Sequence, residues 1–299
     1  MGASNLGGLD SYTSSLLHCD GSDTSTTFTD EVGNTFTAQG NAQIDTAQSV
    51  FGGASGLFDG IGDFLLASNN VTWNFGSGDF SADVRAMFHA LPTAPAHFGL
   101  VAHYDSATSQ REWLFCLNVS RGVYYLQFNY SINGTSVTAC QSTWTPTLDT
   151  WYHLSVVRNG NSLIMRVGGT QVGSTFDMTG ITLHTSTHSL TIGRGASDND
   201  VMNGWLDEVR VSKGIARWTA DFTPPSRAYN NYSDIGLRFK KASGTFIIPV
   251  QTVTSANKLR VYKGSTTYGI PLLATTDYYA GVLRINDGTT TKAIPEEAV

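Results

Sequence analysis

Charged side chains, cysteines and helical patterns are all scarce in this sequence of 299 residues. Only 14% of the residues are Asp, Glu, Lys or Arg, and no solvated, disordered tract is expected. The three cysteines, Cys19, Cys116 and Cys140, cannot all pair within one chain. Cys19 and Cys116 lie in apolar, strand-like runs, where a free cysteine acts as a small hydrophobic residue. The cysteines therefore favour a protein that folds in a reducing cytoplasm over a disulfide-stapled secreted one.

Targeting and membrane signals are also missing. The N-terminus has no basic stretch followed by an apolar core, so no signal peptide of the usual form is predicted. No apolar run approaches the length needed to cross a bilayer, so no membrane insertion is expected. Five Asn-X-Ser/Thr sequons are interpreted as chance products of a sequence rich in these residues. They begin at Asn70, Asn118, Asn129, Asn133 and Asn231.

The residues that are abundant favour short strands joined by tight turns. Aromatic and β-branched side chains suit pleated surfaces, whereas Gly and Asn suit turns. Alternating apolar side chains predict strands at residues 80–88, 113–119, 124–130, 151–157 and 163–167. Turn signals stand at Arg121-Gly122, Asn133-Gly134, Asn159-Gly160 and Gly168-Gly169. So many strands without intervening helices predict a β-sandwich or barrel.

Charge is distributed unevenly along the chain. Residues 1–228 contain 10 Lys and Arg against 19 Asp and Glu, a net charge of −9. Residues 229–299 contain 8 against 5, a net charge of +3. The negative charge of residues 1–228 disfavours a nucleic-acid partner, which is also negatively charged. The basic tail could dock on an acidic protein surface, or its charge could be an accident of composition.

The order of the strand-like segments is more specific than their number. The chain opens with SLLHCDGSDTSTTFTDEVGNTF and continues through DTWYHLSVVRNGNSLIMRVGGTQVGS. It closes with GWLDEVRVSKGIARWTADFTPP, from Gly204 to Pro225, where a strand and a turn precede a Pro-Pro stop. Over residues 14–228 this succession resembles the laminin G-like branch of the concanavalin A-like lectin/glucanase superfamily, in the form common in bacteriophage virion proteins. The resemblance implies an all-β, antiparallel β-sandwich of the jelly-roll, concanavalin A-like type over residues 1–228, serving as a binding module.

A different unit is expected at residues 229–299, after a linker-like segment at residues 226–234. Within this unit Leu-Arg is followed by Ile-Pro at a constant spacing in three copies, each predicted to be a small β-hairpin. A single hairpin is marginal in water, so the copies must stack on one another or on another chain. We interpret this unit as an attachment or oligomerisation domain. The repeat positions are Leu237, Arg238 and Pro249; Leu259, Arg260 and Pro271; and Leu283, Arg284 and Pro295.

Catalytic residues are not apparent. The glucanases of this superfamily carry an E-x-D-x-x-E strand, which places paired carboxylates on one face for acid/base and nucleophile chemistry. This chain has five Glu, at positions 31, 112, 208, 296 and 297, and none lies in that pattern. Asp207 and Glu208 are adjacent and are expected to point to opposite faces of a strand. The sequence therefore predicts no catalytic residue and no enzyme activity.

Calcium is the one cofactor that the sequence suggests. Asp198, Asn199 and Asp200 offer several oxygen ligands in a short loop, as hard cations require. The alternative is a solvated hairpin turn, since Asp and Asn also favour turns for local reasons. His184 and His188 are four residues apart, but in strand and turn rather than on a helix, so we interpret them as structural or incidental.

A glycan-binding surface needs an aromatic platform beside amide or carboxylate groups. Tyr125, Gln127 and Asn129 are predicted to face away from the core along one strand. Glu112 and Asn118 are expected on the polar face of the neighbouring strand. These five residues are the candidate glycan site; the alternative is a solvated sheet face without a ligand. The tryptophans Trp144, Trp205 and Trp218 are expected to pack in the core or at its edges.

Three functions remain open. We expect a non-enzymatic bacteriophage virion protein, such as a tail fibre, head fibre or decoration protein. It would fold in the host cytoplasm, reside on the virion surface and display its sandwich to cell-surface or environmental glycans. Its C-terminal repeats would bind capsid or tail proteins or further copies of the chain. The alternatives are a bacterial carbohydrate-binding or adhesion module and, less favoured, a glycan hydrolase.

Overall fold

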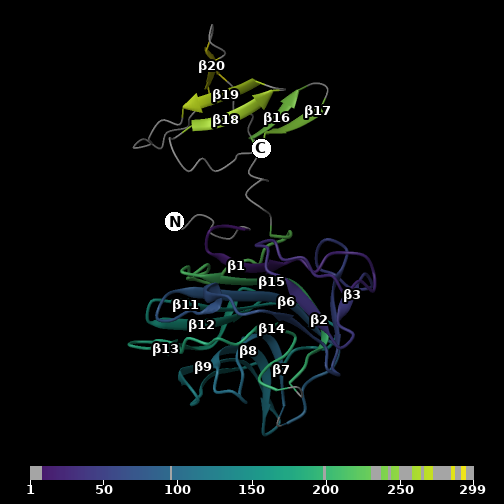
Figure 1. Cartoon of the computed structure of the whole chain (residues 1–299), viewed down its shortest axis with the longest axis vertical. Coiled ribbons are helices and arrows are strands. Elements are labelled where there is room, and N and C mark those ends of the chain that lie inside the picture. Colours follow the sequence, from purple (N-terminus) through teal and green to yellow (C-terminus); the bar gives the residue numbers. More distant parts are fainter. Residues whose placement is uncertain are drawn as a thin grey trace. The chain divides into compact units, whose positions relative to one another are not determined.

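The computed structural model describes residues 9–94, 96–197 and 200–229, together with six short strands between residues 237 and 293. Its contacts divide the chain into two compact units, Met1–Tyr229 and Asn230–Val299. The first unit consists of two sheets (Figure 1), in which every strand pair is antiparallel. The predicted antiparallel β-sandwich is confirmed.

Each sheet mixes strands from distant parts of the chain. The eight-stranded sheet has the order β13 (Thr170–Asp177), β12 (Ser162–Val167), β11 (Trp151–Asn159), β6 (Phe80–Phe88), β15 (Asn203–Lys213), β4 (Ser55–Asp59) and β3 (Gln43–Asp45), and β1 (Thr13–Leu17) also pairs with β15. The seven-stranded sheet has the order β10 (Thr138–Thr143), β9 (Val123–Gly134), β8 (Arg111–Ser120), β7 (His97–His103), β14 (Leu190–Ile192), β5 (Phe64–Ala67) and β2 (Phe36–Gln39). A single 3-10 turn, η1 (Val71–Trp73), is the one helical element of the described sandwich.

The core lies between the two sheets and follows the predicted alternation. In β8 the side chains of Trp113, Phe115 and Leu117 enter it, and in β9 Leu126 and Phe128 do the same. The core is rich in stacked rings. The ring of Phe75 lies 4.2 Å from that of Phe80 and 4.7 Å from that of Trp113. Burying each such ring stabilises the sandwich by roughly 1.5–3 kcal/mol. The three cysteines are buried and free.

The predicted turns occur at or near their expected positions. Between β8 and β9, Arg121 and Gly122 have φ values of 51° and 77°, as a two-residue hairpin turn with the sheet's own twist requires. The Asn133-Gly134 signal does mark a hairpin, but β9 continues through Gly134 before the chain turns. Asn133 initiates that turn, because its Oδ1 accepts hydrogen bonds from the backbone N–H groups of Thr135 and Ser136.

The outer face of the eight-stranded sheet is polar but covered. We call residues 214–229 the closing segment. Its Trp218 and Phe222 rings stack 4.4 Å apart, and His153 of β11 lies edge-on against Trp218. Under this segment Arg210 and Asp83 form a fully buried ion pair at 3.0 Å. The outer face of this sheet is therefore occupied by the chain itself.

The sandwich continues to Tyr229, beyond the start of the predicted linker at residue 226. Tyr229 is 5% exposed, although it lies within the segment 226–234 that was predicted to be a linker. Its backbone N–H donates to Glu208 Oε2 at 2.7 Å, and its hydroxyl donates to Asp83 Oδ2 at 2.5 Å. The linker prediction is wrong for this residue, because contacts with strands far away in the sequence hold it on the sheet.

The second unit contains three separate two-stranded hairpins. They are β16 (Leu237–Lys241) with β17 (Gly244–Ile248), β18 (Lys258–Lys263) with β19 (Thr266–Pro271), and β20 (Arg284–Asn286) with β21 (Thr291–Ala293). The register is equivalent in the three copies, since the repeated arginines oppose Ile247, Gly269 and Ala293. The repeat positions Pro249, Leu283 and Pro295 lie outside the described residues. None of the described helical segments is long and apolar enough to cross a membrane.

Candidate functional site

The outer face of the seven-stranded sheet carries a row of polar side chains. On β9 the residues that alternate with the core side chains are Tyr125, Gln127 and Asn129. Asn118 of β8 lies opposite Tyr125, and Gln141 of β10 lies opposite Gln127. Cross-strand partners share a face, so all five side chains belong to one surface.

Four of these side chains form a hydrogen-bonded row that we call the amide ladder: Asn118, Gln127, Asn129 and Gln141. Gln127 Oε1 accepts from Asn118 Nδ2 at 2.9 Å and from Gln141 Nε2 at 2.6 Å. Gln127 Nε2 donates to Asn129 Oδ1 at 2.7 Å. These bonds hold the amides in one orientation before any ligand arrives, which lowers the entropic cost of binding.

The members of this surface differ in accessibility. Gln127 and Asn129 are only 6% and 8% exposed, so they mainly orient the ladder. Gln141 is exposed, and Asn118 and Tyr125 are half-buried, so these three offer the accessible groups. Gln141 was absent from the candidates predicted from the sequence. The alternation of Ala139, Gln141 and Thr143 along β10 is the signal that could have revealed it.

Glu112 does not belong to this surface. It is fully buried, and its carboxylate accepts from the backbone N–H of Phe75 at 2.7 Å and contacts His103 Nδ1 at 2.8 Å. The pairing of β8 with β9 shifts register between Arg111 and Trp113, which breaks the alternation on which the prediction depended. The expectation that Glu112 faces outward is therefore corrected.

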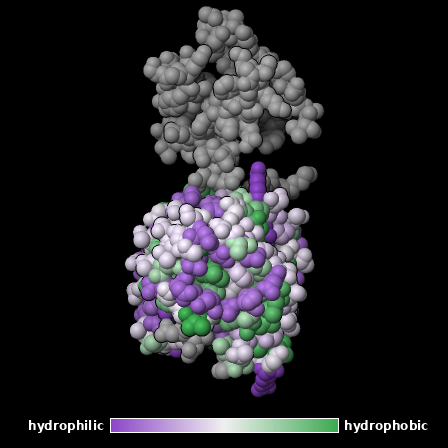
Figure 2. Space-filling view, turned by 90° about the vertical axis from the view of Figure 1, so that its right-hand side faces the viewer, coloured by the Kyte–Doolittle hydropathy of each residue, from purple (hydrophilic) through white to green (hydrophobic). Residues whose placement is uncertain are grey.

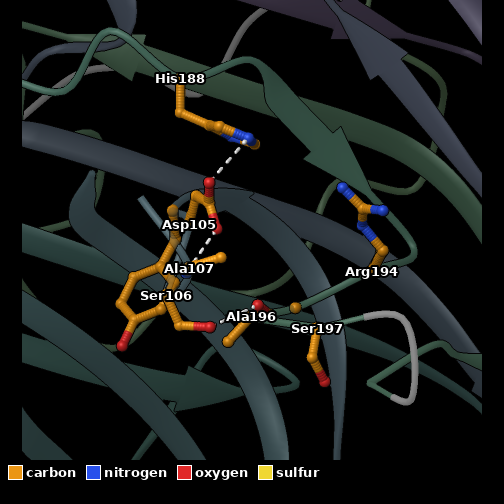
Figure 3. A pocket seen from close by; sticks show the side chains of 9 residues that line it. Asp105, Ser106, Ala107, His188, Arg194, Ala196 and Ser197 are labelled. Carbon is orange, nitrogen blue, oxygen red and sulfur yellow. Dashed lines mark hydrogen bonds and ion pairs between the residues drawn. The ribbon is translucent and has the colours of Figure 1, made fainter. Parts of the chain in front are cut away.

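A pocket of about 310 Å³ opens at one end of the same sheet, between loops that follow β7 and β14. Figure 3 shows Asp105 beneath His188, with Arg194 on the opposite side. His188 Nε2 lies 3.6 Å from Asp105 Oδ2. Ser106 Oγ donates to the backbone carbonyl of Ala196 at 3.0 Å, which joins the two loops. The sequence contained no signal for this pocket, because its lining residues converge only in the folded chain.

The charges of the pocket are of both signs. Burial opposes ionisation of Asp105, but hydrogen bonds from the Thr108 hydroxyl and the Ala107 N–H outweigh it and lower the pKa of this carboxyl. Asp105 is therefore a carboxylate at neutral pH. The guanidinium of Arg194 lies 3.8 Å from the centroid of the Phe64 ring, a distance typical of a cation–π contact.

The loop predicted to bind calcium is fastened to β7. Asp200 Oδ2 accepts from Ser197 Oγ at 2.6 Å, and Asp200 Oδ1 lies 3.4 Å from His97 Nδ1. Asp198 and Asn199 lie outside the described residues. Within residues 9–94, 96–197 and 200–229, no three His, Cys, Asp or Glu side chains are grouped as a metal site would need.

The adjacent carboxylates of β15 also bind the chain itself. Asp207 Oδ2 accepts from the backbone N–H groups of Val50 and Phe51, at 2.8 and 3.1 Å. Glu208 has a φ of 50° at a register shift in β15, and its Oε1 lies 2.5 Å from His18 Nδ1. Burial is the main cause that raises the pKa of Asp207 to about 7. Both carboxylates are 2% exposed or less, so neither can meet a substrate.

Comparison with known proteins identifies the family. A profile of the concanavalin A-like lectin/glucanase superfamily, of the laminin G type, matches residues 59–217. The chain belongs to this superfamily. The match begins in β4 and ends in the closing segment, so it covers most of both sheets. No curated protein sequence matches the chain.

Several solved structures share the lectin-like fold at low sequence identity. The binding domain of Paraclostridial Mosquitocidal Protein 1 has a TM-score of 0.52 and 13% identity, over 96% of this chain and 74% of that one. The receptor binding domain of botulinum neurotoxin C/D mosaic serotype has a TM-score of 0.51 and 9% identity, over 92% of this chain and 65% of that one. The botulinum neurotoxin serotype D ligand binding domain in complex with N-acetylneuraminic acid has a TM-score of 0.50 and 9% identity, over 95% and 68%. At these identities the likeness concerns the fold alone.

Proposed function

We propose that this chain is a non-catalytic glycan-binding protein whose ligand docks on the outer face of the seven-stranded sheet. The observation that carries the proposal is the amide ladder beside Tyr125. Sugars present an apolar C–H face and a rim of hydroxyls, which an aromatic ring and oriented amides can bind together. The solved receptor-binding and ligand-binding domains with the same fold support a binding role over catalysis.

The distribution of carboxylates supports a protein without glycosidase activity. Glycoside hydrolysis requires two carboxyl groups that flank the scissile bond. Glu112, Asp207 and Glu208 are buried and bonded to the chain. Among the described residues that line the pocket, Asp105 is the one carboxylate. A hydrolase is therefore the least supported of the three functions.

The proposal extends to a bacteriophage virion, as a tail fibre, head fibre or decoration protein. The acidic sandwich would face outward on the particle, and the three hairpins in equivalent register would attach it to capsid or tail proteins or to further copies of the chain. Many copies on one particle would raise weak contacts to useful avidity. A bacterial adhesion module remains the alternative.

Two experiments test these proposals. A glycan array probed with the full chain, with and without calcium, should show reproducible binding that Tyr125→Ala abolishes. A blank array for the folded protein would contradict the glycan-binding function. Deletion of residues 230–299 should prevent incorporation of the protein into phage particles. Unchanged incorporation would contradict the division of labour between the two units.

A further inference from the structure

The strands that carry the amide ladder are free of charge over a long stretch. Residues 122–148 contain no Asp, Glu, Lys, Arg or His, in a part of the chain where acidic residues outnumber basic ones by 19 to 10. This stretch supplies all of β9 and β10. The surface over these strands is therefore electrically neutral on an otherwise acidic sandwich. Figure 2 shows hydrophilic and hydrophobic residues interspersed on one side of that sandwich.

The charged residues nearest to this surface lie at its ends or are buried. Arg111 begins β8 and Arg121 lies in the exposed β8–β9 turn, at opposite ends of the surface. His97 of β7 pairs with Asn118 across the strands. Burial lowers the pKa of His97, so its imidazole is uncharged at neutral pH. Asp200, whose Oδ1 lies 3.4 Å from His97 Nδ1, is 7% exposed. Among the described residues, an acidic group of a ligand would therefore find no exposed cationic side chain between these ends.

From these observations we infer that the ligand of this surface is an uncharged polysaccharide that lies as an extended chain along β9. The inference rests on the glycan-binding function proposed above and specifies its substrate class. An acidic sugar would lose hydration at this surface without a compensating charge, which is unfavourable. The net charge of −9 on residues 1–228 would add repulsion within about 8 Å of the surface at physiological salt.

The hydrogen-bonding groups suit sugar hydroxyls. Both Asn118 and Gln141 direct their amide nitrogens to Gln127 Oε1, so their carbonyl oxygens point away from it as acceptors. The Tyr125 hydroxyl can both donate and accept. A hydroxyl also does both, so neutral sugars can satisfy this set without ions. The Tyr125 ring, beside Asn118 and Thr143 in the register, adds an apolar platform.

The dimensions favour a chain over a single sugar. The exposed side chains of this face on β10 run from Ala139 through Gln141 to Thr143, four residues along the strand, which corresponds to about 13 Å. The surface spans three adjacent strands, β8, β9 and β10, a width of about 10 Å. One pyranose ring would leave most of this area in contact with water. An extended chain along β9 would contact Tyr125 and Gln141 with successive residues.

The test uses the full chain and affinity gel electrophoresis against two sets of polysaccharides. The neutral set is dextran, mannan, arabinan and β-glucan, and the acidic set is alginate, polygalacturonate and hyaluronan. At least one neutral polysaccharide should retard the protein, and raising NaCl to about 0.5 M should leave that retardation unchanged, because no ion pair is involved. Tyr125→Ala and Gln141→Glu should each weaken binding about tenfold or more, as loss of a central interface residue does.

Thr37→Glu is the matched control. Thr37 is exposed on β2, at the opposite edge of the same sheet and about 25–30 Å from β10. Thr37→Glu adds the same charge as Gln141→Glu and should leave polysaccharide binding unchanged. The melting temperature of each variant shows whether it is folded.

Preference for acidic polysaccharides, or retardation that salt abolishes, would overturn the inference and leave glycan binding intact. Neutral binding that survives both Tyr125→Ala and Gln141→Glu would also overturn it, by placing the ligand elsewhere. Failure of every polysaccharide to bind would overturn the inference and the proposed function together.

Discussion

Tyr229 offers the sharpest test of how the sandwich is closed. Its hydroxyl donates to Asp83 Oδ2 at 2.5 Å, and its ring lies 3.6 Å from the Arg210 guanidinium. Burial opposes ionisation of Asp83, but Arg210, His153 and the hydrogen bond from Tyr229, in that order, outweigh it and hold the pKa of Asp83 at about 2. The hydroxyl therefore donates to a buried carboxylate at neutral pH.

Tyr229→Phe keeps the ring and removes both interactions of the hydroxyl, the bond to Asp83 and the weaker contact with His153 Nε2 at 3.2 Å. A hydrogen bond to a charged group contributes about 1.5–3 kcal/mol, and this is the expected loss in the free energy of unfolding. For a domain of this size the loss corresponds to a fall of about 3–12 °C in Tm. The assay is thermal or urea unfolding of the full chain followed by tryptophan fluorescence. All six tryptophans lie in the sandwich, so the signal follows that unit alone.

The pH dependence gives a second readout. Because the pKa of Asp83 is lowered on folding from 3.8 to about 2, its stabilisation is complete above about pH 4 and is lost as the pH falls through 2. The difference between the wild type and Tyr229→Phe should shrink over the same range. Tyr12→Phe is the control, since Tyr12 is 47% exposed. Equal stability of Tyr229→Phe and the wild type at pH 7 would refute the docking of the closing segment.

Three further predictions concern buried groups near the two sheets. The pKa of Asp207 is raised to about 7 on folding, so its ionisation destabilises the fold as the pH rises from about 4 to 7. The stability of Asp207→Asn relative to the wild type should therefore be greater at pH 8 than at pH 5, by about 2–3 kcal/mol in urea unfolding; a constant difference would contradict the raised pKa. Glu112→Ala leaves the Phe75 N–H and His103 Nδ1 without their buried acceptor, and should lower the free energy of unfolding by about 3–5 kcal/mol in the same assay. A loss below about 1 kcal/mol would show that the carboxylate is dispensable. At Gly99 an added Cβ would overlap the backbone of Gly195. Gly99→Ala should therefore lower Tm and speed amide hydrogen exchange in the pocket loops. Unchanged protection of residues 194–197 would count against this contact.

The strands were predictable because the alternation of apolar and polar residues in a half-buried strand indicates which of its faces is buried. Alternation placed Trp113, Phe115 and Leu117 in the core, and the structure confirms this. The same rule failed at Glu112, where a register shift interrupts the pairing of β8 with β9. A bulge depends on how two strands meet, and residues 111–113 alone do not specify that.

The amide ladder was only partly accessible to sequence reasoning. Tyr125, Gln127 and Asn129 follow from the period of one strand, whereas Gln141 enters through the register of β10 against β9. Their exposure could not be predicted either, since Gln127 and Asn129 are nearly buried while Gln141 is exposed. Exposure depends on neighbouring strands and loops, which come from other parts of the chain.

By itself the sequence determined the class of this protein: an antiparallel sandwich whose strands and turns follow local alternation and local turn chemistry. It also determined the neutrality of residues 122–148, which no folding step can change. Only the tertiary structure decided which face remains open. The closing segment, ending at Tyr229, covers the polar face of the eight-stranded sheet through contacts that include pairs more than a hundred positions apart. Such contacts depend on the relative placement of whole strands, and a sequence pattern that repeats every second residue cannot encode it.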